Sequence, residues 1–127
     1  MKTDLACRNL LISVVDDHHQ AKIADFGLSE VAYEHRNKSN KPVPIRWSSP
    51  ELLQKLSTVT SKSDVFSFGV VIWEILEHGK VPYTGMANDK VVTHVLGGGR
   101  LPKPENVPEQ FLSLIDQCMH EDPDRRY

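Results

Sequence analysis

Three side chains with oxygen donors near the amino terminus, Asp4, Asn9 and Asp25, are of types that could bind a metal ion or act on a hydroxyl group. Asp4 precedes Asn9 by five residues, and Asp25 follows after two short apolar runs. An amide and a carboxylate that converge suit a hard cation such as Mg²⁺, which takes oxygen ligands and binds together with phosphates. If Asn9 and Asp25 hold the cation, the Asp4 carboxylate is left to act on a hydroxyl group.

A predicted hairpin explains how these residues could meet. Residues 10–12 and 21–24 are strand-like, and residues 16–19 between them have the polar composition of a turn. Because a hairpin places its two ends side by side, the sequence predicts that Asp25 lies beside Asn9.

Composition narrows the class of protein. The chain has 127 residues, 39% hydrophobic and 25% charged, which is typical of one modest globular domain. Its formal charge of -2 argues against nucleic acid as a main partner. The two cysteines, Cys7 and Cys118, form no disulfide framework. The longest apolar run, 70–73, is too short to span a membrane, and no signal-type segment follows Met1. We expect a cytoplasmic protein, or the cytosolic part of a larger or membrane-anchored one.

Five motifs in order resemble the protein kinase family. Asp4 to Asn9 matches the catalytic loop, and Asp-Phe-Gly at 25–27 matches the magnesium loop. Ser49-Pro50-Glu51 stands in the place of the family's Ala-Pro-Glu, and residues 63–69 and 122–126 continue the match. The order of the motifs makes this resemblance far more specific than any one of them.

The resemblance implies an α+β protein kinase-like fold, of which this chain is mainly the helical carboxy-terminal lobe with one small β-hairpin. Residues 1–127 would form part of a kinase domain. The expected segments are a catalytic loop at 2–9, an activation segment at 25–51, and a central helix at about 62–78 that is buried on most faces. Further helices are predicted from Pro50, from Asn88 as an N-cap to Leu96, and from Pro108.

The resemblance also assigns roles to the polar residues. Asp4 resembles the catalytic base that accepts the substrate hydroxyl's proton, and Asn9 and Asp25 resemble the Mg²⁺ ligands that act on ATP. The alternative for each is a purely structural role, in which a loop residue hydrogen-bonds its own backbone.

Three more residues match structural positions of the family. Glu51 and Arg126 match an internal ion pair between the activation segment and the lobe. Asp64 resembles the carboxylate that braces the catalytic loop through backbone amides. Its alternative is an acidic residue placed favourably at a helix N-terminus.

Arg8, the second candidate catalytic residue, bears on which hydroxyl group is phosphorylated. Serine/threonine kinases typically carry a lysine where this chain has Ala6, whereas Arg8 resembles the arginine of the tyrosine kinase pattern. Residues 44–47 are likewise similar to the tyrosine kinase peptide platform, although Trp47 could be a core residue. The expected activity is phosphoryl transfer from ATP to a protein tyrosine. Serine/threonine or dual specificity is the first alternative, and a catalytically dead kinase-like binding or regulatory module is the second.

The chain departs from the family pattern in two ways. Lys2-Thr3 replaces the family's His-Arg, and no glycine-rich loop or strand lysine can be assigned. We therefore expect the chain to need an amino-terminal lobe in cis and to be inactive alone. Tyr33 is a possible phosphosite. Because Thr3 stands where the family's phosphate-binding arginine would be, modification of Tyr33 should have little effect.

Overall fold

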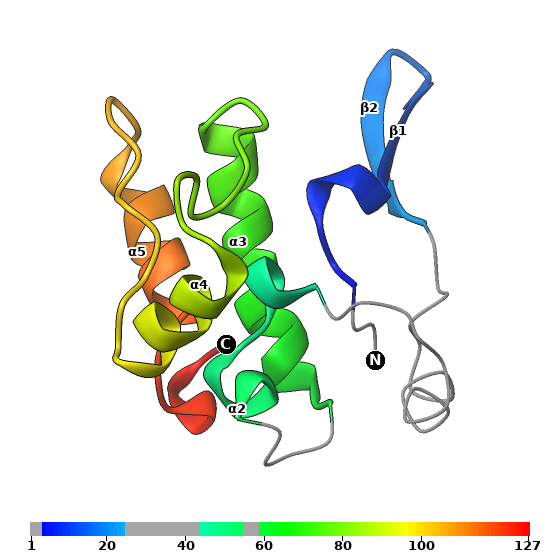
Figure 1. Ribbon diagram of the computed structural model, residues 1–127. Coiled ribbons are helices and arrows are strands. Elements are labelled where there is room, and N and C mark those ends of the chain that lie inside the picture. The colour runs from blue at the N-terminus through cyan, green and yellow to red at the C-terminus, as the bar shows by residue number, and fades with distance from the viewer. Residues whose placement is uncertain (1–3, 25–43, 55–58) are drawn as a thin grey trace.

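The computed structural model describes residues 4–24, 44–54 and 59–127, which form a helical body with a projecting β-hairpin (Figure 1). The predicted mainly helical lobe with one hairpin is confirmed. The strands are β1 Leu10–Val15 and β2 His18–Ile23, and the helices are α2 Pro50–Leu53, α3 Ser61–Leu76, α4 Asn88–Leu96 and α5 Glu109–Cys118. Short 3-10 turns cover Cys7–Asn9, Ile45–Trp47 and Pro123–Arg125.

Helix α3 is the centre of the helical body. It begins with a capping box in which the Thr60 hydroxyl accepts from the Ser63 amide at 3.2 Å. Phe66 and Val70 are fully buried against residues of α4, α5 and the segment after α4. In Figure 1, α4 and α5 lie on one side of α3, and the amino-terminal loop lies on the other. The remaining core residues are Ile72, Trp73, Tyr83, Val91, Val95, Leu101, Ile115 and Met119.

The predicted central helix is present and most of its residues are buried, and it differs from the prediction in two details. Its bounds are 61–76 rather than 62–78, because His78 and Gly79 adopt left-handed backbone angles (φ 55° and 82°) that end the helix. It is also less enclosed than its apolar sequence predicts. Phe68 is 46% exposed and Ile75 is 57% exposed, because none of the described residues covers that face of α3.

The hairpin has a tighter turn than predicted. Leu10 pairs with Ile23 and Val15 pairs with His18, so that only Asp16 and Asp17 lie in the turn. Both aspartates have positive φ (48° and 61°), which a two-residue hairpin turn of type I′ requires and which aspartate tolerates. The prediction that the turn extends to residue 19 was wrong, because β2 begins at His18 and continues the pairing.

Two short helices test the predicted caps. Helix α2 begins at Pro50 as predicted, with Ser49 as its N-cap residue. For α4, the N-cap residue is Ala87, and Asn88 is the first helical residue. Asn88 therefore cannot cap, because its own backbone has already entered the helix. No helix of the described ranges is both long enough and apolar enough to cross a membrane.

The predicted ion pair between Glu51 and Arg126 is present. Arg126 Nη1 and Nη2 donate to the two Glu51 carboxylate oxygens at 2.8 and 3.1 Å, and the arginine side chain is fully buried. Three carbonyl oxygens, of Lys62, His120 and Glu121, accept its other hydrogen bonds. Burial alone would raise the pKa of Glu51, but the hydrogen bonds that its carboxylate accepts, above all from Arg126, and the positive charge of Arg126 together outweigh burial and lower that pKa. The pair ties α2 to the carboxy-terminal end of the chain.

Removing Glu51 should destabilise the chain far more than removing a surface carboxylate. Glu51→Ala leaves a buried guanidinium without its counter-charge, which we expect to lower the free energy of unfolding by about 3 kcal/mol. The control is Asp116→Ala, because Asp116 and Lys103 form an exposed pair at 3.7 Å that should contribute less than about 1 kcal/mol. Urea unfolding measures both.

The same pair predicts a pH dependence. The folded-state pKa of Glu51 is depressed below its ordinary value of 4.5, so its contribution is complete above that pH and is lost as the pH falls below it. A Glu51→Ala effect that is equal at neutral and acidic pH would contradict this account.

Candidate functional site

The loop that contains Asp4 and Asn9 is held by its own side chains. Asn9 is buried, and its Nδ2 donates to the Asp4 carbonyl oxygen at 2.8 Å. Arg8 forms an ion pair with the Asp4 carboxylate. The Ala24 amide donates to the Asn9 carbonyl oxygen at 2.8 Å. The hairpin thus brings residue 24 beside Asn9, as the sequence predicted for the two ends of the hairpin.

The platform, residues 44–47, is fixed to the helical body by Arg46. The guanidinium of Arg46 donates to the carbonyl oxygens of Pro82, Tyr83 and Met86 at 2.8, 2.9 and 2.6 Å. Three carbonyl acceptors converge on one arginine because the loop after α3 curls around it. Sequence reasoning did not single out this contact, since nothing in the order of residues links position 46 to positions 82–86.

Trp47 joins the predicted platform to the loop that contains Asp4 and Arg8. The Arg8 guanidinium carbon lies 4.5 Å from the centre of the Trp47 ring, which is a cation–π arrangement. The Trp47 carbonyl accepts from the Ser67 hydroxyl of α3 at 2.7 Å. The alternative that Trp47 is only a core residue is therefore incomplete. It is half-buried against the core, and it also lies against Arg8, which pairs with Asp4.

Glu74 of α3 is a site residue that the sequence analysis missed. This carboxylate is 7% exposed, and its Oε2 accepts from the Cys7 amide at 3.0 Å and from the Trp47 indole N–H at 2.9 Å. The available signal was a single charged residue between apolar ones, in the run Val70 to Leu76. A buried charge within an apolar helix face requires hydrogen-bond partners elsewhere in the fold.

Asp64, predicted to brace the catalytic loop, lies in the first turn of α3 and is half-buried. The Cys7 amide, within the same loop, donates to Glu74. The bracing role of Asp64 stays a prediction.

Two other assigned residues, Asp25 and Tyr33, lie outside the described residues, as do Lys2 and Thr3. Their roles also stay predictions.

The residues that are described fit a magnesium-bound nucleotide in their chemistry. Because the Asn9 amide nitrogen is engaged with the Asp4 carbonyl, the amide oxygen is the atom left to bind a cation. That oxygen is a hard donor of the kind that magnesium prefers, whereas the Asp4 carboxylate is paired with Arg8. No cluster of three histidine, cysteine or acidic side chains within the described ranges could by itself hold a metal.

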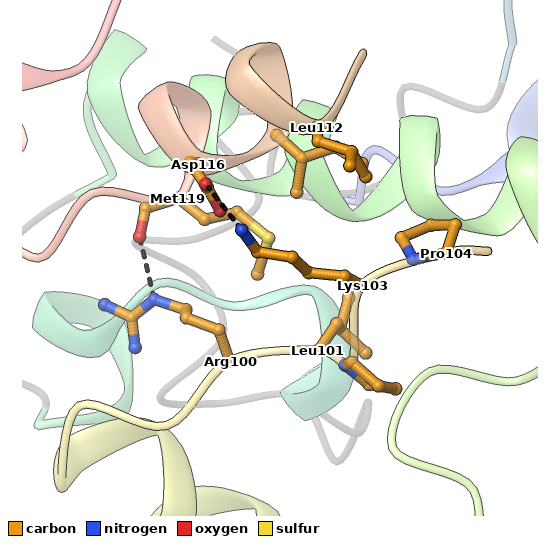
Figure 2. Close-up of a pocket in the computed structure, with 9 residues that line it drawn as sticks. Arg100, Leu101, Lys103, Pro104, Leu112, Asp116 and Met119 are labelled. Atoms are coloured by element: carbon orange, nitrogen blue, oxygen red, sulfur yellow. Dashed lines mark hydrogen bonds and ion pairs between the residues drawn. The ribbon is translucent and has the colours of Figure 1, made fainter. Parts of the chain in front are cut away.

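Two cavities lie away from this loop. Figure 2 shows the smaller, about 50 Å³, between residues 100–104 and α5, where Lys103 faces Asp116. It has room for a few water molecules and none for a nucleotide. A groove of about 850 Å³ lies between the end of α3, α4 and residues 100–105. Neither cavity is lined by Asp4, Arg8 or Asn9.

The fold and the arranged loop agree with a comparison against protein families. Residues 2–127 match the model of the protein tyrosine and serine/threonine kinase family. The chain belongs to this family, and the resemblance seen in the sequence motifs is confirmed.

The curated relatives include two proteins named as tyrosine-protein kinases. The chain is 42% identical over 128 residues to the mouse proto-oncogene tyrosine-protein kinase ROS. It is 37% identical over 130 residues to human tyrosine-protein kinase FRK, and 41% identical over 126 residues to the Xenopus laevis insulin receptor. Each alignment covers 97% of this chain, but only 5%, 25% and 9% of the respective relatives.

The position of Cys7 predicts unusually low thiol reactivity. Its Sγ donates to the Val71 carbonyl oxygen at 3.6 Å. Burial, the nearby Glu74 charge and a hydrogen bond to Glu74 raise the pKa of Cys7 from 9.0 to about 12. Because the thiolate is the reactive form, alkylation by iodoacetamide at pH 8 should be at least about 100-fold slower than for a free cysteine.

A variant that removes the Glu74 charge separates the effect of this charge on the pKa of Cys7 from the effect of burial. Glu74→Gln removes the charge and should speed alkylation of Cys7. Glu77→Gln should not, because Glu77 is the C-cap residue of α3 and pairs with Lys80. Peptide mass spectrometry separates Cys7 from Cys118. If both variants leave the Cys7 rate unchanged, the Glu74 charge does not control this thiol.

Proposed function

We propose that this chain is the carboxy-terminal lobe of a protein-tyrosine kinase domain, which transfers the γ-phosphoryl group of ATP to tyrosine hydroxyls of protein substrates. The kinase family and the tyrosine kinase relatives support the class of reaction. The finer assignment to tyrosine rests on Arg8, which pairs with Asp4 and stacks on Trp47 of the platform.

This arrangement suits a long acceptor side chain. Ala6 is fully buried, so the position where serine/threonine kinases carry a lysine presents no side chain to a substrate. Arg8 instead reaches Asp4 from the platform side. A tyrosine hydroxyl lies a ring's length further from its backbone than a serine hydroxyl. The platform must therefore hold the peptide further from the base, because proper positioning of the reacting groups dominates such a reaction.

Each residue then has one task. Asp4 accepts the proton of the tyrosine hydroxyl, and Arg8 fixes the Asp4 carboxylate against the platform. Asn9 and Asp25 would hold magnesium, which neutralises charge on the phosphates when bound. An amino-terminal lobe in cis would cover the nucleotide, and the platform would receive the peptide.

The test is phosphoryl transfer by a domain in which residues 1–127 are joined to the amino-terminal lobe of a related tyrosine kinase. With ATP and magnesium, phosphoamino-acid analysis should yield phosphotyrosine. Asp4→Asn should lower kcat by about 10²- to 10⁴-fold, the range for a positioned acid–base group. Asp17→Asn is the matched control, because Asp17 lies in the hairpin turn and asparagine tolerates its positive φ equally well.

Two results would replace the proposal. Mainly phosphoserine or phosphothreonine would show serine/threonine or dual specificity. Folded protein that neither binds nor hydrolyses ATP, with Asp4→Asn indistinguishable from the parent, would show a kinase-like binding or regulatory module.

A further inference from the structure

We infer that Glu74 is a positioning residue that couples the peptide platform to the catalytic loop, an inference that rests on the proposed kinase function. One oxygen of Glu74, Oε2, accepts from both the Cys7 amide at 3.0 Å and the Trp47 indole at 2.9 Å. The two donors come from segments 40 residues apart, and helix α3 supplies the common acceptor.

Burial makes these two bonds important. Glu74 is 7% exposed, and no lysine or arginine in the described ranges forms an ion pair with it. Its negative charge therefore depends on neutral N–H donors. Hydrogen bonds to an ionised acceptor are stronger than those between neutral groups, and a buried carboxylate without donors is strongly disfavoured. Both segments are consequently held against α3.

The contacts form a closed circuit around Asp4. Trp47 lies under the Arg8 guanidinium, and Arg8 pairs with Asp4. Glu74 then joins Trp47 back to Cys7, three residues after Asp4 in the chain. The circuit fixes the distance between the platform and the candidate base, which is the distance that an acceptor tyrosine has to match.

The two donors can be removed separately. Trp47→Phe deletes the indole N–H but keeps a ring beneath Arg8. Glu74→Met keeps the approximate shape of the side chain but deletes the acceptor for both donors, and Glu74→Gln restores an acceptor oxygen. Glu77→Met is the matched control, because Glu77 lies three residues further along the chain and pairs with Lys80 rather than with the catalytic loop.

The first readout is amide hydrogen exchange at Cys7 in the joined kinase domain, and it does not depend on activity. Glu74→Met should speed exchange of the Cys7 amide by about tenfold or more, the size expected for one lost charge-assisted bond. Trp47→Phe, Glu74→Gln and Glu77→Met should leave it nearly unchanged. Unchanged exchange in Glu74→Met would overturn the inference. So would faster exchange spread evenly along α3, because that result would indicate general destabilisation.

The second readout is the kinetics of tyrosine-peptide phosphorylation. Trp47→Phe should raise the peptide KM several-fold with a smaller change in kcat, and Glu74→Met should lower kcat about tenfold or more. Glu74→Gln should recover most of kcat. In the Glu74→Met background, adding Trp47→Phe should have little further effect, because the shared acceptor is already gone. Additive effects would overturn the coupling.

The two readouts separate this inference from the proposed function. If the parent domain phosphorylates no tyrosine, the proposed function fails and with it the coupling of platform to base. The exchange result at Cys7 then shows whether Glu74 still fixes the loop. If the parent is active and Glu74→Met is as active as Glu77→Met, the proposed function stands and this inference alone is wrong.

Discussion

Polar groups buried on helix α3 must find hydrogen-bond partners, and this requirement positions the segments that pack around it. Ser63 donates to Glu51, Ser67 donates to the Trp47 carbonyl, and Glu74 accepts from Trp47. Each bond joins the helix to the stretch between residues 47 and 51. Apolar packing alone would allow that stretch to slide along α3, because hydrophobic contact is not directional. The hydrogen bonds select one placement.

Two arginine side chains, Arg126 and Arg100, lie beside the same phenyl ring in the core of this lobe. The fully buried guanidinium of Arg126 has a carboxylate and three carbonyl acceptors. It also lies 5.1 Å from the centre of the Phe66 ring, and Arg100 approaches the same ring at 5.3 Å. Two cations beside one phenyl ring are tolerable because carbonyl oxygens surround both of them.

Sequence patterns predicted the elements better than their edges and contacts. The hairpin, α3 and the Glu51–Arg126 pair follow from spacing and motif. The length of the hairpin turn could not be predicted in this way, because every residue of β2 is exposed and the strand shows no alternation of burial. The exposure of Phe68 could not be predicted from the sequence either. An apolar side chain indicates that burial would be favourable, but not whether another segment covers it. Contacts such as Arg46 with the loop after α3, or Glu74 with Cys7, depend on chain segments brought together only by folding.

The bond from Glu74 to residue 7 uses the backbone amide, whereas its bond to residue 47 uses a side chain. These two bonds therefore restrict substitutions at positions 7 and 47 to different degrees. Position 7 can change its side chain without losing this bond, provided that its amide stays available. Position 47 has no such freedom, because losing the indole leaves a buried acceptor one donor short. Residues 47 and 74 should therefore change together in relatives, while residue 7 varies independently of both.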